Sequence, residues 1–199
     1  MRTAEIAKTD KVIARWMAIP DQLRKVARGL SEARLDDRGD PGLMTIRETV
    51  HHLVEASLVA SNIVIAALAN SGSSYDWTWV NPNASWMRRL GYDKAPVGAA
   101  ISMLGALTRH LAAILSVTPG GLRCTVQLND APGAPRYTKT VRQILGDEVS
   151  HAREHLEALP SAGPRQRRGR QEAARGAARS ARRGHPGSRG QRPGRRARP

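Results

Sequence analysis

Residues 45–70 carry the clearest helical pattern in this chain of 199 residues. Thr45 and Glu48 form a capping box, in which the threonine hydroxyl accepts from a backbone N–H and the glutamate reaches back to the helix start. Small and apolar residues then recur every three or four positions: Ile46, Val50, Leu53, Ser57, Ala60, Val64 and Leu68. This spacing places them on one face of a helix. A helix with such a face has to pack against other elements to bury it.

Three further segments share this periodicity, and proline or glycine follows each of them: residues 4–28, 95–117 and 138–159. We expect Pro20 to kink or restart the first of these helices. Strand character is limited to a possible short strand at residues 123–128. Four amphipathic helices predict an all-α protein with the fold of a four-helix bundle. Its two long connections, residues 71–93 and 118–137, are of the kind that carries function.

The composition changes abruptly after residue 162. Residues 163–199 hold 13 arginines and one acidic residue, and 30 of these 37 residues are Arg, Gly, Ala or Pro. The segment therefore carries most of the net charge of +15. It has no apolar side chain larger than alanine, so burial cannot offset the entropy lost on ordering. The sequence predicts a globular domain over residues 1–162 and a disordered basic tail over residues 163–199.

Two interpretations of the tail stay open. A disordered arginine-rich segment binds nucleic acid weakly and without sequence preference, by releasing counterions from the phosphate backbone. The same residue mixture also arises when GC-rich DNA is translated past a natural stop codon. We favour the second interpretation, in which the tail has no function.

The cellular setting is inferred from features that the sequence lacks. Cys124 is the single cysteine, which excludes an intramolecular disulfide. The N-terminal stretch MRTAEIAKTDKVIARW alternates charged and apolar residues and does not resemble a signal peptide. The longest apolar run, residues 58–69, is interrupted by Ser61 and Asn62 and is too short to span a bilayer. We expect a cytoplasmic protein that does not associate with membranes.

Histidines are the strongest candidates for chemistry. His151 and His155 lie four residues apart in the last predicted helix, so they project from one face of it. His52 has apolar neighbours at helical spacing, whereas His51 shares a stripe with charged residues, so we expect His51 to be exposed or to support the site. His52, His151 and His155 would supply three nitrogens to a divalent metal and leave a position open. Zinc and nickel are the metals that we expect.

Two glutamates lie about one helical turn before these histidines. Glu48 and Glu148 could each orient an imidazole through its other ring nitrogen or act as a general base. Glu48 already has a role in the capping box, so Glu148 is the candidate catalytic residue. The alternative is that His151 and His155 lie on a solvated face of the helix. The charged residues around this pair are consistent with such a face.

The order and spacing of these motifs resemble the DinB/YfiT superfamily of metal-dependent four-helix-bundle proteins. The likeness covers residues 5–160 and includes the stretches LMTIRETVHHLVEA, SYDWTWVNPNASWMRRLGY, LGALTRHLAAILSVTP and YTKTVRQILGDEVSHAREHLEAL. That family places one histidine before a leucine in its second helix and two histidines four apart in its fourth. His52, His151 and His155 match this pattern. Met44 departs from it, because members often have a tryptophan there, and the basic tail has no counterpart.

The resemblance implies a metal-dependent enzyme, with several reactions open to it. The leading hypothesis is an S-transferase in which a low-molecular-weight thiol, held as thiolate at the three histidines, attacks a small electrophile. The frequent use of Ala, Gly and Arg indicates a GC-rich genome and favours mycothiol as that co-substrate. The alternatives are a hydrolase or isomerase with the same site, and a non-catalytic stress-response module that binds metal or none.

Aromatic residues cluster in the connection that follows the helix over residues 45–70. We expect four of them to form the wall of a substrate pocket: Tyr75, Trp77, Trp79 and Trp86. The alternative is that they pack at the end of the bundle. The expected partner is a small-molecule substrate, and the family resemblance also implies a homodimer.

Overall fold

A computed structural model describes residues 10–38, 42–78, 80, 84–129 and 131–159. The chain divides into two units, Met1–Pro160 and Ser161–Pro199, and the second unit lies outside the described residues. The prediction of a disordered tail over residues 163–199 therefore falls outside the described part of the chain.

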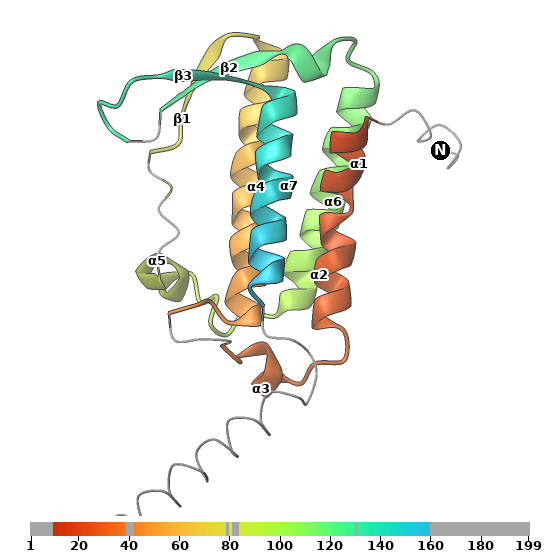
Figure 1. The fold of residues 1–199 in the computed structure, drawn as a ribbon, viewed down its shortest axis with the longest axis vertical. Helices are drawn as coiled ribbons and strands as arrows, with labels where there is room; N and C mark the ends of the chain where they lie inside the picture. The colour runs from red at the N-terminus through yellow and green to blue at the C-terminus, as the bar shows by residue number, and fades with distance from the viewer. Residues whose placement is uncertain (1–9, 39–41, 79, 81–83, 130, 160–199) are drawn as a thin grey trace, which may run out of the picture. The chain divides into compact units, whose positions relative to one another are not determined.

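Four helical rods form the body of the first unit (Figure 1). One rod is made of two short helices in succession, and each of the other three is a single long helix: α1 (Lys11–Met17) with α2 (Ile19–Ala27), then α4 (Ile46–Ala69), α6 (Val97–Ser116) and α7 (Val141–Glu157). Helix α4 packs against α6 and α7, and the first rod packs against the same two helices. The predicted four-helix bundle is confirmed.

Local signals in the sequence determine where the main helices begin. Thr45 accepts a hydrogen bond from the backbone N–H of Glu48 at 3.0 Å, and the Glu48 carboxylate accepts from the Thr45 N–H at 2.8 Å, so the capping box is present. Pro20 lies in the first turn of α2, where a missing N–H costs no helical hydrogen bond. Thr140 and Gln143 form a second capping box at the start of α7.

A small three-stranded sheet lies across one end of the bundle (Figure 1). Its central strand β2 (Thr125–Asn129) pairs in parallel with β1 (Ser73–Asp76) and antiparallel with β3 (Tyr137–Thr140). The possible strand predicted at residues 123–128 corresponds to β2. Strands β1 and β3 were not predicted, because they have four residues each and show too little alternation to be recognised without their partner. The last helix begins at Val141 and not at about Thr138, because β3 occupies residues 137–140.

Short helices occupy the connections. Helix α3 (Glu32–Leu35) and helix α5 (Ala84–Arg89) lie toward the end of the bundle opposite the sheet, and the 3-10 helix η2 (Gly121–Arg123) precedes β2 (Figure 1). The buried guanidinium of Arg47 holds this end together, since it donates to Asp36 at 2.7 Å, to the Ala95 carbonyl at 3.1 Å and to Glu32.

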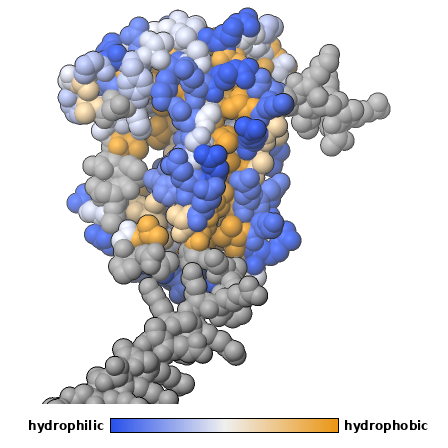
Figure 2. All heavy atoms as spheres, in the orientation of Figure 1, coloured by the Kyte–Doolittle hydropathy of each residue, from blue (hydrophilic) through white to orange (hydrophobic). Residues whose placement is uncertain are grey.

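The hydrophobic core fills the space between the four rods. Its largest fully buried side chains come from every rod: Trp16, Leu23, Leu53, Leu104, Leu111 and Leu145. By length and composition alone, α4 and α6 could each cross a membrane, and core helices of bundles can have the same length and composition. The buried share of the apolar stretch is 56% in α4 and 33% in α6. Hydrophilic residues cover much of the face seen in Figure 2.

Candidate metal centre

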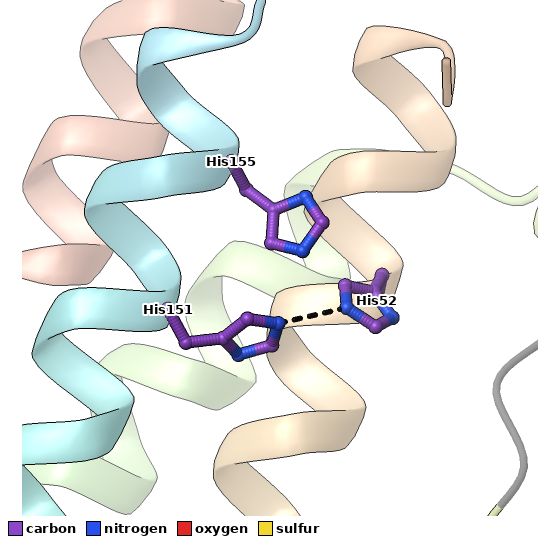
Figure 3. A group of neighbouring side chains, drawn as sticks. All are labelled: His52, His151 and His155. Carbon is purple, nitrogen blue, oxygen red and sulfur yellow. Dashed lines mark hydrogen bonds between the residues drawn. The ribbon is translucent and has the colours of Figure 1, made fainter. Parts of the chain in front are cut away.

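Two neighbouring helices supply the three predicted histidine ligands. His52 lies in the second turn of α4, while His151 and His155 lie one turn apart near the end of α7. Because α4 and α7 pack side by side, the His52 side chain faces the pair on α7 (Figure 3). His52 is buried, with 8% of its surface exposed, and the other two are half-buried.

The three imidazoles converge within the dimensions of a single metal site. One ligand nitrogen from each ring can be chosen so that all three lie within 4.8 Å of one another. The Nε2 atoms of His52 and His151 are 3.0 Å apart, and the three ring centroids are separated by 4.6–5.0 Å (Figure 3). The sequence-based prediction that these three side chains meet is therefore confirmed by their positions.

Burial keeps all three imidazoles neutral at pH 7. The pKa of His52 is lowered to about 4, mainly by burial and also by the neighbouring His155 and His151, because a second positive charge there would be repelled. The pKa of His151 is lowered by burial and by His155, and the pKa of His155 is lowered by burial, with Glu154 opposing the shift in both. Neutral rings offer the free lone pairs that a metal requires.

The donor set fits a divalent ion. An imidazole nitrogen lies about 2.0–2.1 Å from zinc, so three nitrogens within 4.8 Å of one another can surround one ion after a small movement of the rings. The Nδ1 atom of His52 is buried and has no hydrogen-bond partner among the described residues. The pair of Nε2 atoms at 3.0 Å either shares a single proton or presents two lone pairs to one cation.

Glu148 lies on α7 three residues before His151 and shares a cavity with it. Its carboxylate accepts a hydrogen bond from the Ser57 hydroxyl at 3.2 Å. Burial raises the pKa of Glu148 to about 7, although the Ser57 hydrogen bond acts in the opposite direction and Asp147 adds a smaller increase. A carboxyl group with this pKa can both accept and donate a proton near neutral pH, which is what a general acid–base residue requires.

His51 and Glu48 do not join the cluster. His51 is buried, not exposed as one expectation had it: its ring stacks on Tyr92 with centroids 4.7 Å apart, and its Nε2 lies 3.2 Å from the Ala95 carbonyl oxygen. Periodicity missed this because Tyr92 comes from a distant connection. Glu48 is used by the capping box, as predicted, and also pairs with Arg38 at 3.1 Å.

A cavity of about 380 Å³ opens beside the histidines, between α4, α7, the sheet and the connection that contains α5. His52, His151 and Glu148 all line it. Of the four predicted aromatic wall residues, Trp77 and Trp86 line the cavity as expected. Tyr75 does not, because β1 pairs it with Leu128 and it packs on the core, and Trp79 lies outside the described residues.

Sequence reasoning missed several other wall residues. Tyr92 follows α5 in the same aromatic connection and could have been included with the tryptophans. Tyr137 and Lys139 belong to β3, which brings them to the cavity only because it pairs with β2. No pattern within the sequence indicated that pairing.

The fold and this cluster define a four-helix bundle with a candidate three-histidine metal centre. No family model matches the chain, and no curated protein matches it. Among solved structures, it is similar to YfiT from Bacillus subtilis, described as a probable metal-dependent hydrolase with an unusual four-helix bundle topology. The TM-score is 0.64 at 19% sequence identity, and the match covers 77% of this chain and 84% of YfiT. At this identity the comparison establishes a shared fold.

Proposed function

We propose that this protein is a metal-dependent hydrolase in which His52, His151 and His155 hold one divalent ion and Glu148 transfers the proton. The observation that carries the proposal is the convergence of three neutral imidazoles at the edge of a cavity. The likeness to YfiT, a probable metal-dependent hydrolase, supports it through the shared fold.

A divalent ion held by three neutral nitrogens keeps its full charge, so when bound it would polarise a carbonyl group and lower the pKa of water. Glu148 would then act on the proton. As a carboxylate it would take a proton from the attacking water, and it would give that proton to the leaving oxygen or nitrogen as the bond between this atom and the acyl carbon breaks. The Ser57 hydroxyl, 3.2 Å from Glu148, would hold the carboxylate in place.

The thiol S-transferase expected from the sequence is the second candidate. The same neutral donor set favours it, since an undiminished positive charge also stabilises a bound thiolate. In that reaction Glu148 would take the thiol proton, and the sulfur would displace a leaving group from the electrophile. Mycothiol is a hydrophilic thiol, whereas the cavity walls are mainly apolar, so the walls do not favour this particular co-substrate.

The first test is elemental analysis of the full-length protein purified without chelators. We expect one divalent ion per chain, and its loss in His52→Ala. The matched control is His110→Ala, because His110 is exposed on α6 and lies outside the cluster. A protein without stoichiometric metal, or a His52→Ala variant with unchanged metal content, would contradict the proposal.

The reaction class is tested with an activated ester and an activated alkyl halide, each with and without added thiol. Hydrolysis of the ester without thiol supports the hydrolase, and strictly thiol-dependent loss of the halide supports the transferase. A protein that binds metal stoichiometrically but turns over neither substrate would be a non-catalytic metal-binding module.

A further inference from the structure

The cavity beside the histidines has walls made mainly of hydrocarbon. Helix α4 contributes Ala56, Val59 and Ile63, helix α7 contributes Ile144, and the connections contribute Trp77 and Trp86. Hydrophobic side chains also reach the surface below the sheet in Figure 2. Apolar ligand surface that is buried against such walls contributes favourably to the binding free energy. The same walls offer few hydrogen-bond partners to hydroxyl or sugar groups.

The carboxylates and the ammonium group that line the cavity are already engaged within the protein. Glu55 accepts from the Tyr92 hydroxyl, and Glu148 accepts from Ser57. Lys139 and Asp147 pair with each other at 2.6 Å. In the metal-free protein, a charged ligand would lose its hydration on entry and would meet no unengaged carboxylate or ammonium group among these described wall residues.

From these two observations we infer that the cavity binds an uncharged, largely apolar molecule, such as a small aromatic ester. Its reactive carbonyl would face His52 and His151, and its hydrocarbon would lie against the apolar walls. The volume of about 380 Å³ is that of roughly a dozen water molecules in the liquid, so the cavity has room for a small ligand with at least a similar number of non-hydrogen atoms. The catalytic part of this inference rests on the proposed hydrolase, whereas the binding part does not.

Binding can be measured on the full-length protein without metal, by calorimetry together with tryptophan fluorescence. The probes are 4-nitrophenyl butyrate, which is neutral, and 4-carboxyphenyl butyrate, which is anionic and nearly isosteric with it. We expect the neutral ester to bind at least tenfold more tightly. Along the 4-nitrophenyl acetate, propionate and butyrate series, affinity should rise roughly fourfold per methylene, since each added group is buried against apolar walls.

A variant that fills the cavity tests whether the ester binds there. Ala56 lies one turn after His52 on α4 and lines the cavity, so Ala56→Phe should weaken binding of 4-nitrophenyl butyrate at least tenfold. The control is Ala113→Phe, because Ala113 is exposed on α6 and does not line the cavity. Should Ala56→Phe lose its helical circular dichroism, the smaller Ala56→Leu serves the same purpose.

Equal or tighter binding of the anionic ester, or no gain along the acyl series, would overturn this inference. Unchanged binding in a folded Ala56 variant would also overturn it. Failure of the proposed function has a different signature: the neutral ester would bind the metal-free protein but would not be hydrolysed after metal is added.

Discussion

Replacing Glu148 by glutamine should make the pH dependence of stability visibly different from that of the wild-type protein. Burial raises the pKa of Glu148 from its usual 4.5 to about 7. Between these values the folded state binds the proton more tightly than the unfolded state does. Glu148 therefore favours folding at low pH, and this contribution is lost as the pH rises from 4.5 through 7.

The expected magnitude follows from the size of the pKa shift. Since one pKa unit corresponds to about 1.4 kcal/mol, a shift from 4.5 to about 7 costs the wild-type protein about 3 kcal/mol of unfolding free energy between pH 4.5 and pH 8. The neutral amide of Glu148→Gln does not ionise and can still accept from Ser57. The variant should therefore gain about 3 kcal/mol relative to wild type over this pH range.

The contribution of His52 to the pH dependence of stability has the opposite sign. Its pKa is lowered from 6.5 to about 4, so its contribution to stability is present above pH 6.5 and is lost as the pH falls toward 4. In the wild-type protein the two effects overlap and largely offset each other between pH 4.5 and 6.5. In Glu148→Gln the opposing contribution of Glu148 is absent. The unfolding free energy of this variant should therefore fall steeply as the pH decreases, because only the effect of His52 remains.

The assay is urea unfolding of the metal-free proteins at pH 4.5, 6 and 8, followed by circular dichroism. Glu157→Gln is the matched control, because Glu157 is an exposed carboxylate on the same helix, with only a 4.0 Å contact to Arg153. We expect this control to follow the wild-type curve. If the stability difference between Glu148→Gln and wild type were the same at all three pH values, Glu148 would not be buried as a titrating group and the reasoning would fail.

Two further predictions concern the histidines and the helix that presents one of them. Zinc affinity of the wild-type protein, measured against a competing chelator, should fall less between pH 8 and pH 6 than it would for solvated histidines, because the pKa values of all three imidazoles are lowered by burial. A steep decline that already begins near pH 6.5 would indicate ordinary solvated histidines. Thr45→Ala removes the hydroxyl that accepts from Glu48 and should lower the unfolding free energy by about 1 kcal/mol at pH 7. Urea unfolding checks this, and a loss below a few tenths of a kcal/mol would mean that the cap does not stabilise α4.

The four-helix bundle and the three histidines were predictable from sequence because each rests on a local signal. Helical periodicity, the capping box at Thr45 and the spacing of His151 and His155 are properties of neighbouring residues. A choice between His51 and His52 also followed from periodicity, since adjacent positions on a helix point about 100° apart. The two share one helix but face different partners.

The sheet and the cavity depended on contacts between distant segments. Most of β3 was expected to be helical, although tyrosine and threonine favour strands, because four residues are too few to show a period. Pairing with β2 keeps this segment extended. For the same reason Lys139 and Tyr137 were not expected in the cavity, and Tyr75 was expected there although β1 places it against the core.

The sequence by itself determined where the long helices form and which side chains are able to bind a metal, because helix periodicity, capping and imidazole chemistry are local properties. The tertiary structure decided which of these groups meet, how deeply they are buried and what space lies beside them. The low pKa of His52 and the raised pKa of Glu148 exist only once α4 and α7 exclude water from around them. Burial is a property of the packed molecule, so no local pattern in the chain could predict it.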